Sequence, residues 1–372
     1  MIYFDSAATT LQKPAAVPRA AARAMTTMTT PGRGDYPASR AAAELMLALR
    51  TEAADFFGAA QPENVILTGS ATHGLNIAIR DLVHPGDTVV ISGYEHNAVT
   101  RPLHAVGGVS VKIVNAPLFA PEQMAEGFRR ALAEGGAAAV ICTHVSNAFG
   151  YVLPVQEIAA LCRERQVPLI VDAAQSAGTL PVDVEGWGAA YVAMPGHKGL
   201  YGPQGTGLLL CGKDRTPSPL LAGGTGSLSR QQDMPDFLPD RLEAGTQNVH
   251  GAAGLLEGLR FVARQGTGPI LRHERRVIRR LAERLGDRSG VRAFYGGDQS
   301  GGVLSVILDG EAPEVTADRL AERGIAVRAG LHCAPLAHIT AGTVRTGTVR
   351  FSASAFNTLQ EADQAADALL ET

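Results

Sequence analysis

Short apolar runs alternate with segments of helical periodicity between about Glu63 and Leu210, and this alternation limits the folds open to the chain. The runs are rich in β-branched residues, which is typical of strands that are buried on both faces. Such a pattern predicts an α/β fold with a mostly parallel sheet and helices on both of its faces. Strands are expected at 64–68, 89–92, 110–114, 140–143, 167–172 and 189–194, and helices at 124–133 and 158–165.

The C-terminal third of the chain has a different pattern. Its expected elements are a charged, arginine-rich helix at 269–285, a strand at 302–308 and a helix at 314–323. These elements indicate a second, smaller α+β domain, and the arginines are interpreted as a solvated helix face. We expect a large domain at 15–250 and a small domain formed by 1–14 and 251–372. The Gly-, Ser- and Pro-rich stretch at 216–239 is expected to be irregular and to be functional or interfacial.

Composition and charge exclude several classes of function. The chain of 372 residues has a formal net charge of −3, so it lacks the basic footprint of a protein that binds nucleic acid or an anionic membrane. No apolar run approaches the roughly 20 residues of a membrane span, and the N-terminus lacks the features of a signal peptide. We therefore expect a cytoplasmic protein with no nucleic-acid partner and no membrane partner.

The four cysteines do not form the disulfide framework of a small secreted protein, and no pair of them has metal-ligand spacing. Cys142, Cys162 and Cys211 fall in predicted strands or helices and are interpreted as small core hydrophobes. Cys333 differs because it stands in a loop, directly after a histidine and before Ala334-Pro335. No metal site is expected.

Two ionisable residues follow predicted strands at the sheet edge where α/β proteins bind ligands. Lys198 stands in a Gly-rich turn, where burial would disfavour its ammonium form and leave an amine that can form a Schiff base with an aldehyde cofactor. Asp172 ends the apolar run at 167–172, and an acid there can pair with a protonated pyridine nitrogen. Taken singly, Lys198 is more typical of a surface turn and Asp172 of a helix N-cap.

A strand, a turn and a helix near the N-terminal side form a third element. The strand at 64–68 leads into Gly69-Ser70-Ala71-Thr72-His73-Gly74 and then into an apolar-periodic segment at 75–82. A turn of this composition presents backbone N–H groups and hydroxyls to a phosphate at a helix N-terminus. A single loop of this kind also occurs in α/β proteins that bind no phosphate.

Ordered motifs extend these three elements along the whole chain: Tyr3–Thr10, Glu95–Asn97, His144–Asn147, Gly196–Lys198, Leu242–Asn248, Arg328–Pro335 and Val349–Ser352. In this order they resemble the pyridoxal-phosphate enzymes of fold type I. More narrowly, the chain is similar to the class V aminotransferase group, which contains the cysteine desulfurases and the selenocysteine lyases. The resemblance implies pyridoxal 5'-phosphate as the cofactor and the two-domain α/β architecture described above.

The resemblance also implies roles around the cofactor ring. Lys198 would hold the cofactor and then act as the base that moves the α-proton of the substrate. Asp172 would pair with the pyridine nitrogen, and Gln175 would hydrogen-bond the phenolic oxygen. His96 matches a histidine that stacks on the ring face and shuttles protons, although a buried structural histidine is the alternative.

Phosphate binding is assigned by the same resemblance to the turn formed by Ser70, Ala71 and Thr72 and to His197. It adds Thr246, which would reach the phosphate from the neighbouring subunit and so implies a homodimer with shared active sites. One position departs from the family pattern. Many desulfurases carry a serine two residues before the histidine of the lysine motif, and Pro195 offers no hydroxyl there.

Three residues are expected to bind the substrate. Arg350 is the expected clamp for the carboxylate of an amino acid, because a guanidinium matches a carboxylate with two hydrogen bonds. The resemblance places Asn147 beside that carboxylate and the ring oxygen. It also matches Arg33 to an arginine that lines the entrance from the second subunit, and an ordinary loop arginine is the alternative.

These inferences converge on a cysteine desulfurase that converts L-cysteine to L-alanine and leaves the sulfur on Cys333 as a persulfide. The short segment around Cys333 resembles the form of the family that passes sulfur to a dedicated acceptor protein. A selenocysteine lyase, or another C–S lyase that needs no catalytic thiol, is the alternative enzyme. A non-catalytic homologue is the alternative outside catalysis, and the presence of Lys198, Asp172 and Arg350 argues against it.

Overall fold

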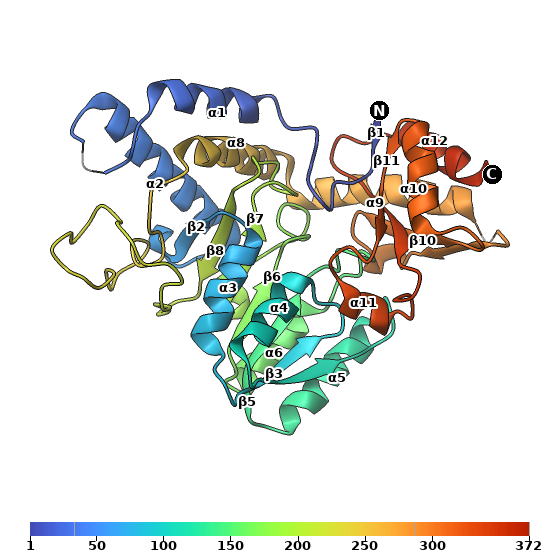
Figure 1. Ribbon diagram of the computed structural model, residues 1–372, viewed down its shortest axis with the longest axis horizontal. Helices are drawn as coiled ribbons and strands as arrows, with labels where there is room; N and C mark the ends of the chain where they lie inside the picture. Colours follow the sequence, from blue (N-terminus) through green and yellow to red (C-terminus); the bar gives the residue numbers. More distant parts are fainter. Residues whose placement is uncertain (33, 287, 372) are drawn as a thin grey trace.

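Two sheets of different size organise the fold (Figure 1). The computed structural model describes residues 1–32, 34–286 and 288–371. Within these ranges the larger sheet has seven strands in the order β2-β8-β7-β6-β5-β3-β4. They are β2 (Val65–Thr68), β3 (Thr88–Ser92), β4 (Ser110–Val114), β5 (Ala137–Thr143), β6 (Leu169–Asp172), β7 (Tyr191–Pro195) and β8 (Gly207–Cys211).

The seven strands are parallel except for β8, which runs antiparallel to both of its neighbours. All the parallel strands therefore end at one edge of the sheet. The loops that follow them bring together residues from five separate parts of the sequence, and the predicted α/β sheet is confirmed.

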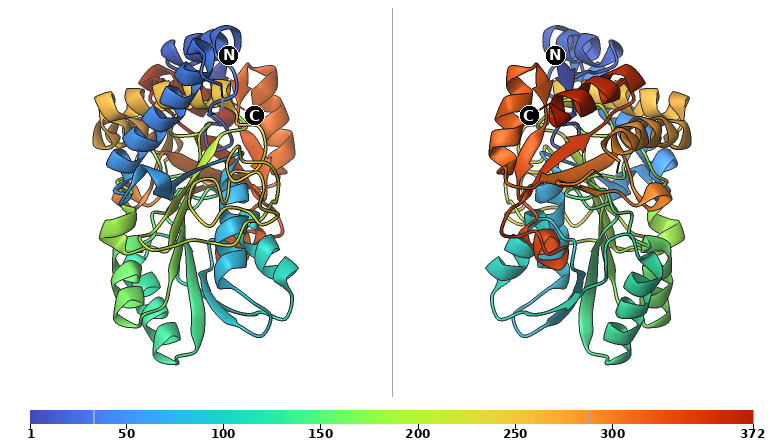
Figure 2. Two further views of the ribbon diagram at one scale, coloured as in Figure 1. Left: turned by 90° about the vertical axis from the view of Figure 1, so that its left-hand side faces the viewer. Right: turned by 90° about the vertical axis from the view of Figure 1, so that its right-hand side faces the viewer.

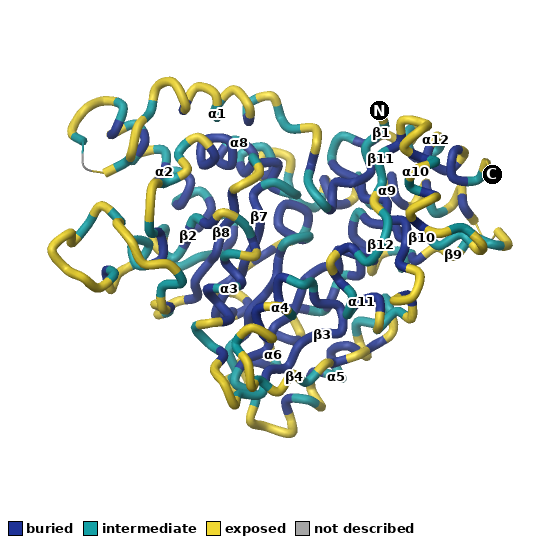
Figure 3. The backbone as a smooth tube through the Cα atoms, viewed as in Figure 1, coloured by how far each residue is buried: buried dark blue, intermediate teal, exposed yellow. Residues whose placement is uncertain are grey.

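Helices cover both faces of this sheet, which Figure 2 shows edge-on. One face packs against α3 (Ala71–Leu82) and α4 (Asn97–Val106), and the other packs against α5 (Pro121–Ala133) and α6 (Val155–Glu164). Alternate residues of β5 divide between the two cores: Val140 and Cys142 face α5 and α6, whereas Ile141 faces α3 and α4. Each core buries side chains that are fully or almost fully excluded from water, as the dark segments in Figure 3 indicate.

The smaller sheet has four antiparallel strands in the order β12-β13-β10-β9. They are β9 (Val291–Phe294), β10 (Val303–Leu308), β12 (Arg328–Gly330) and β13 (Thr348–Ser352), and they pack against α9 (Thr267–Leu285), α10 (Pro313–Glu322) and α12 (Leu359–Leu370). Helix α12 begins with a capping box, in which Thr358 and Glu361 each bond the backbone N–H of the other.

The first residues of the chain belong with this smaller layer, and both termini lie beside it in Figure 1. Strand β1 (Ile2–Tyr3) pairs with β11 (Ile325–Ala326), and Asp5 forms a parallel bridge with Ser352. Next come α1 (Ala16–Thr27) and α2 (Pro37–Phe57), which pack against α8 (Val249–Gln265). The remaining helices are α7 (Val184–Trp187), α11 (Pro335–Thr340) and the 3-10 turns at Pro62–Asn64 and Gly297–Gln299.

Several expectations from the sequence can be compared with this fold. The stretch at 216–239 contains neither helix nor strand, as predicted. The division into domains at residues 14 and 250 stays a prediction. In the described part of the chain, none of the helices has the length and hydropathy needed to cross a membrane.

Candidate active site

A cavity at the carboxyl edge of the large sheet collects most of the residues that the sequence singles out. It lies where β6 and β7 end side by side, with Asp172 in register with Ala193. Its lining includes nine of the predicted site residues: Ser70, Ala71, Thr72, His96, Asn147, Asp172, Gln175, His197 and Lys198. The parallel topology explains why these residues lie together. Each one lies at or just beyond the end of a strand, or at the start of the helix that follows.

Lys198 is held in the cavity by a tight turn. Gly178 and Gly199 lie so close together that a Cβ atom on Gly178 would overlap the carbonyl group of Gly199. This close approach packs the turn that carries Lys198 against the loop that follows Asp172. Burial lowers the pKa of the Lys198 amine to about 8, and the nearby Asp172 partly opposes this shift. The amine therefore loses its proton more readily than an exposed lysine does.

Asp172 is 3% exposed and is the last residue of β6. One of its carboxylate oxygens, Oδ1, accepts a hydrogen bond of 2.9 Å from the backbone N–H of Ala174. Burial raises the pKa of Asp172, while this hydrogen bond and the charge of Lys198 act in the opposite direction. A buried acid in this position has its best partner in a cationic ring nitrogen.

His96 caps the N-terminus of α4 and is fixed in one neutral form. Its Nδ1 accepts a hydrogen bond of 3.0 Å from the backbone N–H of Ala98. Burial, assisted by the charges of Lys198 and Arg350, lowers the pKa of His96 to about 4. The ring is therefore neutral at physiological pH and carries its hydrogen on Nε2, because Nδ1 acts as an acceptor.

The first turn of α3 and His197 line the same cavity, and together they could bind an anion. Ser70 Oγ accepts from the backbone N–H of His73 at 3.2 Å, which leaves the N–H groups of Ala71 and Thr72 available at the helix N-terminus. His197 Nδ1 lies 3.0 Å from Thr9 Oγ1, so its Nε2 can serve a ligand. Burial, with the nearby charges of Lys198 and Lys13, lowers the pKa of His197 to about 4.

Arg350 is 2% exposed and already has two partners in this structure. Its Nη2 donates to Asp5 Oδ1 at 2.8 Å, and its Nη1 donates to the backbone carbonyl of Asn147 at 3.0 Å. Its Nε is buried and has no hydrogen-bond partner among the described residues. Sequence reasoning missed Asp5, although it stands in the Tyr3–Thr10 motif, because nothing local links it to an arginine 345 positions away.

Cys333 is exposed and stands on a short, fixed loop between β12 and α11. Both His332 and Cys333 have positive φ angles, of 50° and 55°, which turn the chain sharply at this point. Asn147 Nδ2 donates to the carbonyl of His332 at 2.7 Å, and the N–H of Asn97 donates to the carbonyl of Cys333 at 2.8 Å. These bonds attach the loop to the residue after His96 and to the wall of the cavity.

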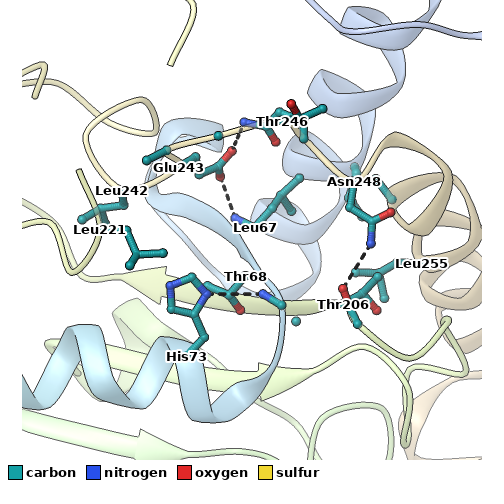
Figure 4. A pocket seen from close by; sticks show the side chains of 18 residues that line it. Leu67, Thr68, His73, Thr206, Leu221, Leu242, Glu243, Thr246, Asn248 and Leu255 are labelled. Atoms are coloured by element: carbon teal, nitrogen blue, oxygen red, sulfur yellow. Dashed lines mark hydrogen bonds between the residues drawn. The ribbon is translucent and has the colours of Figure 1, made fainter. Parts of the chain in front are cut away.

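The remaining site predictions have separate outcomes. Gln175 lines the cavity, with its Nε2 donating to the carbonyl of Ala7 at 2.9 Å. Thr246 is exposed and lines a different cavity of about 180 Å³, together with Thr68 and His73 (Figure 4). It is therefore not among the residues that line the lysine cavity in its own subunit. Arg33 lies outside the described residues.

The chemical groups that line the lysine cavity fit a pyridoxal phosphate. A buried amine can hold the aldehyde carbon, a buried carboxyl can pair with the ring nitrogen, and the first turn of α3 can take the phosphate. The amide oxygen of Asn147 is a further buried acceptor without a partner in the described ranges. Pro195 also lines the cavity and offers no hydrogen-bond donor, so the phosphate contacts from this subunit would come from the turn at 70–72 and His197.

Comparison with known proteins agrees with this geometry. Residues 2–365 match the family model for class V aminotransferases. The chain is 32% identical to a probable cysteine desulfurase of Methanothermobacter thermautotrophicus, with 97% of this chain and 92% of that protein covered. It is 31% identical to a probable cysteine desulfurase of Mycolicibacterium paratuberculosis over 98% of its length, and it spans 54% of that longer relative.

Solved structures give the same result for the fold. The cysteine desulfurase of Thermococcus onnurineus superimposes with a TM-score of 0.89 at 30% identity, covering 100% of this chain and 94% of that one. The Escherichia coli cysteine desulfurase CsdA gives a TM-score of 0.85 at 27% identity, covering 99% and 93% of the two chains.

Proposed function

Because the chain belongs to the class V aminotransferase family of pyridoxal-phosphate enzymes, we propose that it is a cysteine desulfurase. It would convert L-cysteine to L-alanine and leave the sulfur on Cys333. The observation that carries this proposal is the exposed Cys333, whose loop is bonded to Asn97 and to Asn147, a residue that lines the cavity of Lys198. The curated relatives and the solved structures named above point to the same activity.

Each residue of the site has a separate role in the proposed reaction. When bound, the cofactor would supply an electron sink for the carbon that loses its proton. Lys198 takes the proton from the α-carbon. Burial lowers the pKa of its amine, so more of the amine is in the neutral form that can accept a proton. Asp172 would stabilise the positive charge of the ring nitrogen, and His96, which also lines the cavity, offers its Nε2–H as a proton donor.

In the sulfur-transfer step, the sulfur of the substrate thiol passes to the thiol of Cys333. The Cys333 sulfur attacks as a thiolate and forms a bond to the sulfur of the substrate, while the bond from that sulfur to the substrate's β-carbon breaks. The electron pair stays on the β-carbon, which takes a proton and becomes the methyl group of alanine, and Lys198 returns the proton to the α-carbon. The protein keeps both sulfur atoms as a persulfide.

The loop geometry favours a protein as the next acceptor. Cys333 is tied through its own carbonyl and through that of His332, and the loop runs only from Gly330 to Pro335. A loop of this length and attachment cannot carry the sulfur far from the cavity. We propose that a separate acceptor protein approaches Cys333 at the surface.

A homodimer with shared sites is part of the proposal. Thr246 is exposed, and so are Leu221, Leu228 and Phe237 of the irregular segment that precedes it. A second subunit that packs on this segment would bury these apolar side chains. In this arrangement Thr246 of each subunit would approach the phosphate bound by the other.

The test of the proposed activity is a substrate panel with the purified holoenzyme. We expect L-cysteine, in the presence of a reducing thiol, to give alanine and sulfide in equal amounts, measured by amino-acid analysis and a sulfide assay. L-selenocysteine is the comparison substrate for the alternative lyase. Pyruvate and ammonia in place of alanine, or turnover of selenocysteine alone, would contradict the proposal.

Replacing Arg350 with alanine should weaken substrate binding far more than cofactor binding. Losing a partly buried contact between a guanidinium and a carboxylate costs about 2–5 kcal/mol, which raises the KM for cysteine by more than roughly thirtyfold. The cofactor's dissociation constant, measured by spectral titration of the apoprotein, serves as the internal control. An unchanged KM for cysteine would remove Arg350 from the substrate site.

A further inference from the structure

Asp5 lies between two guanidinium groups, and one of them, that of Arg350, is bonded to the carbonyl of Asn147, which lines the lysine cavity. Its Oδ1 accepts from Arg350 Nη2 at 2.8 Å, and its Oδ2 accepts from Arg328 Nη2 at 2.8 Å and from Arg328 Nε at 3.1 Å. Strand pairing fixes this arrangement, because Arg328 of β12 stands directly opposite Arg350 of β13. Asp5 is 8% exposed, so this carboxylate is largely shielded from water.

The two arginines differ in what they can reach. Arg350 is buried, with Nε unpartnered among the residues described, so it keeps donors for one ligand carboxylate. The side chain of Arg328 is 52% exposed, and both of its hydrogen-bonded nitrogens are directed at Asp5. The hydrogen bonds that Arg328 donates to Asp5 raise the pKa of Arg328, and smaller electrostatic contributions, including one from Cys333, act in the same direction.

All three charges act on the reacting centre. The positive charges of Arg350 and Arg328 help to lower the pKa of Lys198, whereas the negative charge of Asp5 opposes them. One carboxylate between two guanidinium groups leaves a net charge of one positive unit. That charge is balanced by a single ligand carboxylate, and no positive charge then remains for a second one.

We propose that Asp5 determines which amino-acid side chains the site accepts, by neutralising Arg328 beside Cys333 and leaving Arg350 to bind one carboxylate. The proposal rests on the proposed function, in which an α-amino acid enters this cavity. With Asp5 in place, the side chain of the ligand meets a neutral pair, which suits an uncharged group such as a thiol. Without Asp5, Arg328 would attract a second carboxylate, so amino acids with acidic side chains would bind more tightly. Asp5 is thus a positioning residue that acts through Arg328.

The experiment compares the binding of L-alanine and L-aspartate to the wild-type holoenzyme and to Asp5→Asn. Dissociation constants come from the change in the absorption spectrum of the bound cofactor, so no turnover is needed. Asparagine keeps the size of the side chain and one acceptor, while the backbone bonds from Ser352 to Phe4 and from Ser6 to Ser352 anchor the segment. Removing one charge at this range should shift the ratio of the two constants toward aspartate by at least about tenfold.

Two further variants separate a charge effect from a structural one. Arg328→Gln in the Asp5→Asn background should abolish the gain for aspartate, because the second carboxylate loses its partner. Asp363→Asn, which removes a surface pair with Arg280 on α9, should leave the ratio as in the wild type. A gain for aspartate that persists without Arg328, or an unchanged ratio in Asp5→Asn, would overturn the proposal.

If Asp5→Asn does not fold, Arg328→Gln alone still gives an answer. Asp5 would then be left with Arg350 only, the net charge of the group would fall to zero, and L-alanine should bind at least about fivefold more weakly. Unchanged binding of L-alanine would overturn the proposal, as would the failure of both amino acids to bind any of the proteins. These binding measurements do not depend on sulfur release. A failure of the proposed desulfurase activity can therefore be distinguished from a failure of the proposal about Asp5.

Discussion

Replacing Lys198 with alanine is expected to abolish the covalent link between the protein and its cofactor. In the wild type, borohydride reduction should fix the cofactor to Lys198, and mass spectrometry of the digested protein should show the added mass on the peptide that contains it. The physical reason is the burial that lowers the pKa of this amine to about 8 beside Asp172. Turnover of cysteine should fall to background, because the α-carbon of the substrate loses the base that takes its proton in the proposed reaction.

Lys13 provides a matched control for this prediction. Burial also lowers the pKa of its amine to about 8, and its Nζ bonds Thr10 Oγ1 at 2.6 Å and the carbonyl of His197 at 3.1 Å. It is thus an activated amine next to the site that does not line the cavity. We expect Lys13→Ala to retain the reducible link. A reducible link that survives in Lys198→Ala would show that another amine holds the cofactor.

The sequence was informative where function depends on strand ends. Asp172 and Lys198 could be placed because a buried strand precedes each one, and parallel strands end at the same edge. The turn at 70–72 could be placed for the same reason, since a strand leads into it and a helix follows. Local pattern and topology together were sufficient for this part of the site.

Other features depend on contacts that no local pattern contains. The pairing of Asp5 with Arg350 joins residues from opposite ends of the chain, and both arginines that hold Asp5 come from the smaller sheet. The direction of β8 was also not predictable, because the apolar run at 207–211 has the same periodicity in a parallel and an antiparallel strand. The neutral form of His96 follows from its backbone partner at Ala98, which only the start of α4 reveals.

Replacing Cys333 with serine should stop the release of alanine while leaving the binding of cysteine intact. A serine hydroxyl has nearly the same size as the thiol, so the loop held by Asn97 and Asn147 should keep its shape. It cannot, however, attack a sulfur atom at neutral pH, because the alkoxide is not formed there. We therefore expect a spectral change on addition of cysteine in this variant, with alanine production reduced by at least about a thousandfold.

The remaining cysteines make the product easy to locate. Cys142, Cys162 and Cys211 are buried, and burial raises the pKa of each of their thiols, to about 12 for Cys162. They are therefore poor nucleophiles, whereas Cys333 is exposed on the loop that is bonded to Asn147. After turnover of the wild type in the absence of a reducing thiol, mass spectrometry should show one added sulfur atom on the peptide that contains Cys333 and on no other. Near-normal alanine production by Cys333→Ser would instead favour the lyase that needs no catalytic thiol, because the sulfur would then leave without passing through the protein.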